Sequence, residues 1–207
     1  MLEKVFFSFH YEKDNWRVQQ IRNMGVVEGD QLVEPNDWEE IKRKGVNSIK
    51  NWINDQLRQS NVVVVLVGSE TAERKWIQYE IETAWNMGKP ILGIEIHELL
   101  DGSGKSDFNG RNPFVDFTID RKGKAKVYES AYGINWDGTP MSHYVKLYDP
   151  LSNEYRDLSE DHSIRFINES EKRKRRSQIA YGVINEYLPE WIEEARLSRE
   201  NALREFL

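Results

Sequence analysis

The stretch Trp76–Ile96, WIQYEIETAWNMGKPILGIEI, decides the fold class because it joins a helical pattern, a Gly-Lys-Pro break and an apolar strand. At about 100° per residue, the apolar side chains of its first half fall on one arc, which predicts an amphipathic helix. Glu80 lies on the flank of that arc, one turn after Trp76, whereas Glu82 lies across from it and is expected to be solvated. The side chains on the arc are Ile77, Ile81, Ala84 and Trp85.

The position of Glu80 permits two interpretations. An acid at the edge of an apolar face, beside an indole, is a candidate for a partly desolvated carboxylate with a chemical role. The alternative is a flank glutamate whose carboxylate reaches into solvent. Spacing alone favours the second interpretation, because perturbed acids are the minority.

The rest of the first half alternates strand and helix patterns. Two β-rich runs, Lys4–Phe9 and Val62–Gly68, precede helical segments, and the second run, VVVVLVG, is continuously apolar. Continuously apolar strands between helices indicate a parallel sheet that is covered on both faces. The prediction is an α/β fold with a flavodoxin-like open sheet in the order 2-1-3-4-5. The expected helices span Asp14–Met24, with Asp14 as the cap, and Val46–Leu57, and a weaker strand is expected within Val26–Val33.

Ligands bind an open parallel sheet at the carboxyl ends of its strands, where the winding direction reverses. For this strand order, that point lies between the first and third strands, and the helix that carries Glu80 follows the third strand directly. Topology and helical phase therefore both favour Glu80 as a site residue. The residues that leave the two strands are Ser8, Phe9, His10 and Tyr11, then Gly68, Ser69 and Glu70.

The second half has a weaker pattern, and we predict a division into residues 1–120, the α/β domain, and residues 121–207, a C-terminal β/helical extension packed on the same domain or forming a lid. Short strands are expected within Val127–Tyr148. A helical pattern runs from Glu169 to Phe206, interrupted before Pro189.

Composition restricts the class of protein. The chain has 207 residues, seven tryptophans, no cysteine and a net charge of −6. The absence of cysteine excludes disulfides and thiolate metal ligands, and the negative charge argues against broad nucleic-acid binding. The N-terminus MLEKVFF lacks a signal-peptide layout, and Val62–Val67, the longest apolar run, is too short to span a bilayer. A cytoplasmic protein is expected, with no membrane partner.

Three other motifs have simpler explanations. Gly104-Lys105-Ser106 resembles the end of a phosphate-binding P-loop, but Leu99 stands where the pattern requires glycine, so a flexible loop is favoured. The four histidines lack metal-ligand spacing, so no metal site is expected, although His10 lies at the predicted ligand-binding edge. The basic run at 172–176, KRKRR, is best explained as a solvated helix face.

Three blocks together resemble the Toll/interleukin-1 receptor (TIR) domain family, and within it the TIR-like subunits of the bacterial Thoeris antiphage system. They are VFFSFHYEKD at Val5–Asp14, NVVVVLVGSE at Asn61–Glu70 and KWIQYEIETAWNMGKPILGI at Lys75–Ile94. Aligning the pattern W-x-x-x-E-I on Trp76 places the catalytic glutamate of the family at Glu80. The segment Glu34–Gly45 takes the place of the family's variable loop. The resemblance covers residues 3–97.

The resemblance implies an enzyme that cleaves NAD, its substrate rather than a resident cofactor, at the nicotinamide–ribose bond. It implies a cyclic ADP-ribose-type product that acts as an antiphage signal and activates a separate effector protein. Glu80 would stabilise an oxocarbenium-like ribose. Aromatic side chains would stack on flat rings and exclude water; the candidates are Phe9, Tyr11, Trp76 and, in the loop that would form a lid, Trp38. Whether the chain forms a homo-oligomer stays open.

Two alternatives remain at this point. A nucleoside deoxyribosyltransferase also uses a carboxylate at a ribose on a similar sheet, and a nucleobase-exchange assay would distinguish it. A non-catalytic TIR-type assembly module would need no carboxylate, so an intact Glu80 favours an enzyme over a module.

Overall fold

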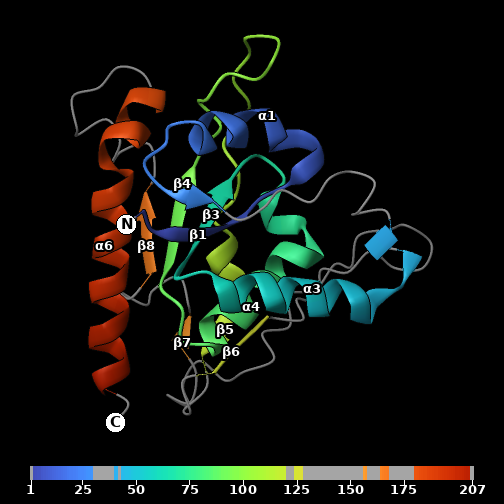
Figure 1. Cartoon of the computed structure of the whole chain (residues 1–207), viewed down its shortest axis with the longest axis vertical. Helices are drawn as coiled ribbons and strands as arrows, with labels where there is room; N and C mark the ends of the chain where they lie inside the picture. The colour runs from blue at the N-terminus through green and yellow to red at the C-terminus, as the bar shows by residue number, and fades with distance from the viewer. Residues whose placement is uncertain are drawn as a thin grey trace.

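A computed structural model describes residues 2–29, 40–41, 43–119, 124–127, 156–157, 164–167 and 180–205 of the chain. Strands and helices alternate through its first half, as the sequence predicts (Figure 1). The elements of that half are β1 (Lys4–Ser8), α1 (Tyr11–Arg22), β2 (Glu28–Gly29), α3 (Val46–Gln59), β3 (Val62–Val67), the short 3-10 helix η1 (Thr71–Glu73), α4 (Lys75–Asn86) and β4 (Ile91–Glu95). Those that follow are the 3-10 helix η2 (Pro113–Asp116), β5 (Phe117–Ile119), β6 (Ala125–Val127), β7 (Arg156–Asp157), β8 (Ile164–Ile167) and α6 (Ala180–Glu205).

The main sheet is parallel and has the strand order β2-β1-β3-β4-β8. This confirms the predicted α/β class and the order 2-1-3-4 of its first four strands. β1 and β3 are neighbours, with Ser8 opposite Val65, so the carboxyl ends of the two strands lie at the same edge. The fifth strand, β8, comes from late in the chain and pairs in parallel with β4.

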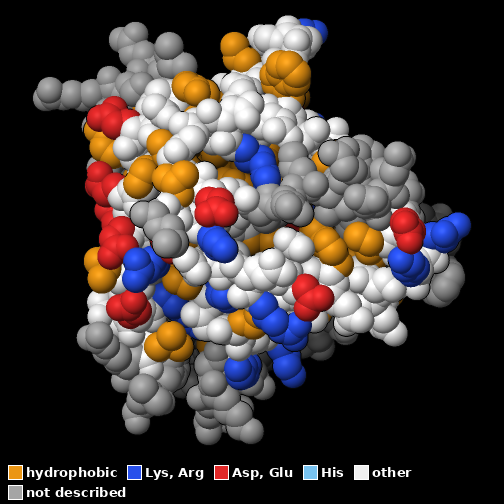
Figure 2. Space-filling model, viewed as in Figure 1, with side chains coloured by type: hydrophobic (Ala, Val, Ile, Leu, Met, Phe, Trp, Pro, Cys, Tyr) orange, Lys and Arg blue, Asp and Glu red, His pale blue; other side chains and the backbone are white. Residues whose placement is uncertain are grey.

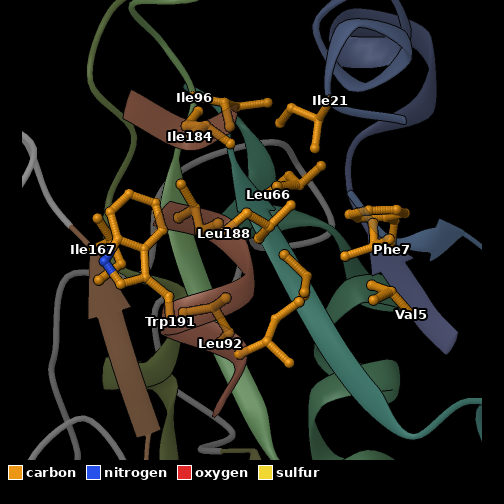
Figure 3. Packing of buried hydrophobic residues seen from close by; sticks show 14 of the residues in the cluster. Val5, Phe7, Ile21, Leu66, Leu92, Ile96, Ile167, Ile184, Leu188 and Trp191 are labelled. Carbon is orange, nitrogen blue, oxygen red and sulfur yellow. The ribbon is translucent and has the colours of Figure 1, made fainter. Parts of the chain in front are cut away.

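Each face of the sheet carries its own apolar core, because alternate side chains of a strand point to opposite faces. On one face, β-strand side chains pack with α1 and α6; Figure 3 shows Phe7, Leu66 and Trp191 of this cluster. On the other face, Phe6 and the alternate residues of β3 pack with α3 and α4. Successive residues at the end of β1 therefore face opposite sides of the sheet.

The chain beyond residue 120 contributes to the same body. β5, β6 and β7 form a small antiparallel sheet in the order β6-β5-β7. Phe117, Ile119 and Ala125 from it join the core beneath α3 and α4. α6 lies alongside β8 and contacts β4, opposite α3 in the view of Figure 1. The predicted boundary at residue 120 stays a prediction, but β8 and α6 are structural parts of the main sheet and its cover.

Two sequence expectations about helices are wrong. The first helix begins at Tyr11 rather than at an Asp14 cap, and His10 occupies the N-cap position without a side-chain cap. Asp14 instead lies inside α1, fully buried, and receives a hydrogen bond from Arg17 at 3.2 Å. The last helix is not interrupted before Pro189, which lies inside α6. The buried side chains Leu188 and Trp191 on either side of Pro189 hold the helix on the sheet.

The described surface carries charged side chains of both signs, in keeping with the composition of the chain. On the face drawn in Figure 2, acidic and basic side chains are interspersed over the described elements. Within the described residues, no helix combines the length and apolar composition needed to cross a lipid bilayer.

Candidate active site

Glu80 projects from the flank of α4 and meets the end of β1. Ile77, Ile81, Ala84 and Trp85 of α4 are all buried, which confirms the predicted phase of the helix. Ser8, the last residue of β1, is fully buried, and its hydroxyl donates a hydrogen bond of 2.6 Å to Oε2 of Glu80. The Glu80 side chain is only partly buried. Two residues that the sequence places at the site by separate arguments are therefore in direct contact.

The contact follows from the alternation of β1. Phe6 packs beneath α3 and α4, while Phe7 packs on the opposite face. Ser8 therefore faces α4, as Phe6 does. A hydroxyl that donates to a carboxylate makes a charge-assisted hydrogen bond, which is shorter and stronger than a neutral one. Ser8 thus holds one carboxylate oxygen of Glu80 in a fixed orientation.

Phe9 and Tyr11 follow Ser8 in the chain, and their rings lie near each other. Phe9 packs against the cluster that α1 and α6 cover, on the face opposite to Ser8. The ring of Tyr11, the first residue of α1, lies 6.1 Å from the ring of Phe9 between centroids. The structure thus brings these two aromatic side chains together.

Trp76 lies one turn before Glu80 and packs against the core beneath α3 and α4. Its ring meets the ring of Tyr79 edge to face, with 6.2 Å between centroids. Tyr79 in turn donates a hydrogen bond to Asn54 of α3 at 3.2 Å. Trp76 is therefore part of the α3–α4 contact, on the same helix as Glu80.

His10 follows β1 and is 8% exposed. Burial lowers the pKa of its imidazole, and the positive charge of Arg74 lowers it further. Nδ1 lies 3.8 Å from Oε2 of Glu70 and has no hydrogen-bond partner. A neutral imidazole at this edge can accept or donate one hydrogen bond there, which keeps His10 as a candidate ligand contact.

A network of charged side chains joins three segments at the same edge. Lys13 of α1 lies 2.9 Å from Glu70 and 3.3 Å from Asp107, measured from Nζ to the carboxylate oxygens. Arg74, at the start of α4, donates to Glu70 at 2.6 Å. Ser69 donates to Asp107 at 2.8 Å. The hydrogen bonds from Lys13 and Arg74 lower the pKa of Glu70, so its carboxylate stays charged at neutral pH.

The comparisons with known proteins identify the family of the chain. The family described as "Thoeris protein ThsB, TIR-like domain" matches residues 6–101, which include both Ser8 and Glu80. A protein of Bacillus cereus (strain MSX-D12), named "Putative cyclic ADP-D-ribose synthase ThsB1", is 36% identical over 155 residues, which cover 71% of this chain and 78% of that protein. The chain belongs to the Thoeris ThsB family. The resemblance stated from the sequence is thereby confirmed.

Three charged residues of this ThsB-family chain were not expected from its sequence. Lys13, Arg74 and Asp107 come together with the predicted Glu70 and Ser69. Lys13 and Arg74 flank predicted segments, so proximity in sequence could have suggested them. Asp107 is 38 residues from Ser69 in sequence, and no pattern in its glycine-rich loop singles it out.

The Gly104-Lys105-Ser106 triplet of the ThsB-family chain is folded in a way that does not suit a phosphate. The Asp101 carboxylate accepts hydrogen bonds from the backbone N–H groups of Ser103 and Lys105 and from the Ser103 hydroxyl. The backbone N–H of Gly104 donates to the carbonyl of Asp101. A P-loop needs such N–H groups to bind phosphate. In this loop they are already bonded to Asp101.

The remaining expectations concern metals and Trp38. Among the described residues, no group of three or more histidine, aspartate and glutamate side chains could hold a metal ion. Trp38, His143, His162 and the basic run at 172–176 lie outside the described residues. The role of Trp38 as an aromatic wall of this ThsB-family site therefore stays a prediction.

Proposed function

We propose that the chain is an NAD-cleaving enzyme that uses Glu80 to break the nicotinamide–ribose bond and releases a cyclic ADP-ribose-type product. The observation that carries the proposal is the 2.6 Å hydrogen bond from buried Ser8 to Glu80 at the carboxyl end of β1. It supports a role for Glu80 because an oriented carboxylate at the ligand-binding edge of the sheet is what the reaction requires. The name of the Bacillus cereus relative supports the class of product.

One carboxylate is sufficient for this chemistry. Glycosidases usually need a second acid to protonate the leaving oxygen. In NAD the bond between ribose C1′ and the pyridinium nitrogen breaks, and the electron pair leaves with nicotinamide as a neutral base. Glu80 then stabilises the positive charge that develops on the ribose, with one of its oxygens held by Ser8.

The second step determines the product. Attack on C1′ by an adenine nitrogen or a ribose hydroxyl of the same molecule gives a cyclic product, and one proton is released to solvent. Attack by water gives linear ADP-ribose and one proton. Cyclisation therefore requires that adenine is held near C1′ while water is excluded. In the Thoeris setting the product would act in the cytoplasm as an antiphage signal for a separate effector protein.

The direct experiment is to incubate the purified chain with NAD and to identify the products by chromatography and mass spectrometry. We expect nicotinamide and a cyclic ADP-ribose isomer from the wild type, and far less of either from Glu80→Gln in the same time. Lysates taken after phage challenge provide the same measurement in a triggered state. Linear ADP-ribose alone from an active preparation would make the chain an NAD hydrolase and contradict the signalling part of the proposal.

A further inference from the structure

The C-terminal end of α4 is bound by side chains from the second half of the chain. Helix ends leave their last carbonyl groups without partners inside the helix, and cations are favourable there because of the helix dipole. The carbonyl of Trp85 accepts a hydrogen bond from Nη2 of Arg199 at 3.0 Å. The carbonyl of Asn86 accepts one from Nζ of Lys124 at 3.1 Å. Both cations lie outside residues 6–101, the part that matches the ThsB family.

Arg199 makes the more specific of the two contacts. It is 4% exposed, and its guanidinium carbon lies 3.7 Å from the centroid of the Trp85 ring. The Trp85 side chain is itself 1% exposed. A planar guanidinium can stack on an indole and donate to a carbonyl at the same time, which the ammonium of lysine cannot do. Arg199 therefore fixes both the backbone and the side chain of Trp85.

α6 carries Arg199 from one face of the sheet to a helix on the other. Ile184, Leu188 and Trp191 of α6 pack into the cluster shared with α1. Trp85 belongs to the cluster on the opposite face. The contact between Arg199 and Trp85 thus links the two layers of helices directly.

The same helix holds Glu80, five residues before Trp85. At 1.5 Å of rise per residue, the two positions are about 7.5 Å apart along the axis of α4. The helix is continuous between them. A shift of its C-terminal end along the axis would therefore move Glu80 relative to Ser8, which belongs to the sheet.

We propose that Arg199 is a positioning residue for the active site, which sets the axial position of α4 and through it the hydrogen bond between Ser8 and Glu80. This inference rests on the proposed function for its kinetic effect. A displacement of about 1 Å in a reacting group costs up to 100-fold in rate. The loss is expected in kcat rather than in KM, because Arg199 does not contact the substrate edge of the sheet.

The kinetic test compares Arg199→Met with two controls on α6. Arg196→Gln removes an exposed cation that pairs only with α6 acids, Glu193 and Glu200, in the described contacts. Ile192→Val removes one buried methylene from α6 and weakens its packing without touching α4. We expect Arg199→Met to lower kcat for NAD about 10- to 100-fold with little change in KM. Both controls should keep kcat, and Arg199→Lys should recover part of the loss.

Unfolding of a variant would also lower its activity, so the assays are run at a temperature where every variant is folded. If Arg199→Met keeps the wild-type kcat, or loses no more than Ile192→Val does, the proposal is wrong. Inactivity of the wild type towards NAD would contradict the proposed function instead.

A second measurement does not depend on activity. Arg199→Met should raise amide hydrogen exchange along α4, including the turn that carries Glu80, whereas Ile192→Val should raise it only in α6. Unchanged exchange in α4 of the Arg199 variant would overturn the positioning role, whatever the substrate.

Discussion

Ser8 and Glu80 are 72 residues apart in sequence, yet the hydroxyl of the first lies 2.6 Å from the carboxylate of the second. Ser8 is fully buried, so the hydrogen bond is shielded from water on the side of the sheet. The sequence patterns predict Ser8 at the end of the first strand and Glu80 on the helix after the third. The direct contact between them is what makes the edge of the sheet a candidate active site.

Ser8→Ala should lower the rate of NAD cleavage and leave the fold intact. A hydrogen bond to a charged group contributes about 1.5–3 kcal/mol, which corresponds to a loss of roughly 10- to 100-fold if the orientation of Glu80 is needed in the transition state. The rate of nicotinamide release measures the effect. Ser48→Ala, which removes an exposed hydroxyl bonded to Lys44, is the matched control and should behave as the wild type. Equal rates for Ser8→Ala and wild type would contradict the role of Ser8.

Glu80→Gln should retain the fold but lose about 10²- to 10⁴-fold in turnover, or roughly 3–5 kcal/mol of transition-state stabilisation. The amide keeps the size of the side chain and removes its charge.

Glu82→Gln is the control on the same helix. The helical phase predicted that Glu82 would be solvated. In the structure its Oε2 instead accepts a weak hydrogen bond of 3.4 Å from the backbone N–H of Val127. The amide oxygen of glutamine can preserve that contact, so full activity is expected; similar losses in both variants would exclude a special role for Glu80.

Acidification should destabilise the protein through His10. Its pKa in the folded state lies below the ordinary value of 6.5, mainly because the side chain is buried. Below pH 6.5 the unfolded chain therefore binds a proton that the folded chain does not, and the free energy of unfolding decreases as the pH falls through this value. Urea unfolding at pH 7.5 and pH 5.5 measures the difference. His10→Gln should reduce it, and an unchanged difference in the variant would exclude His10 as the cause.

A second pH effect is expected at the loop after β4. Three hydrogen bonds from Lys105 and Ser103 lower the pKa of Asp101 to about 2 from 3.8. The charged carboxylate therefore contributes stability above pH 3.8, and this contribution is lost as the pH falls towards 2. Proteolysis of the loop, followed between pH 5 and pH 2.5 with an acid-active protease, reports the change. Asp101→Ala should be cleaved readily at both pH values; resistance of this variant at pH 5 would contradict the role of the carboxylate.

Lys105→Ala should leave NAD cleavage unchanged, although the triplet it belongs to resembles a phosphate-binding motif. The backbone groups of the loop are bonded to Asp101, and the Lys105 side chain is exposed. Steady-state kinetics with NAD as substrate provide the test. A marked rise in KM for the variant would show that this loop contacts the nucleotide after all.

The sequence was most informative where one pattern had one structural solution. VVVVLV at Val62–Val67 can be buried on both sides only in the middle of a covered sheet, and each of its residues is 0% exposed. The helical phase of α4 placed Glu80 on the flank of the packed face. The alternation of strands and helices indicated a parallel sheet, and its first four strands have the order expected for a flavodoxin-like fold.

Other features depend on contacts that local patterns do not encode. β8 consists of four residues, IRFI, which join the sheet only because the edge of β4 is available. Phe9 follows Ser8 directly, but strand alternation directs it to the opposite face. The carboxylate of Asp107 and the guanidinium of Arg199 contact residues that are distant from them in sequence. Neither charge has a distinguishing neighbour pattern.

The late position of β8 and α6 has a consequence for synthesis of the chain on the ribosome. Until residue 167 has emerged, β4 is an edge strand with an unpaired row of backbone groups. Until α6 follows, the apolar face of the sheet that Trp191, Leu188 and Ile184 of α6 cover in the finished protein is exposed. The parallel sheet and its cover are therefore completed only after β8 and α6 have been synthesised. A nascent chain that stops at residue 120 should be a substrate for chaperones rather than a folded domain.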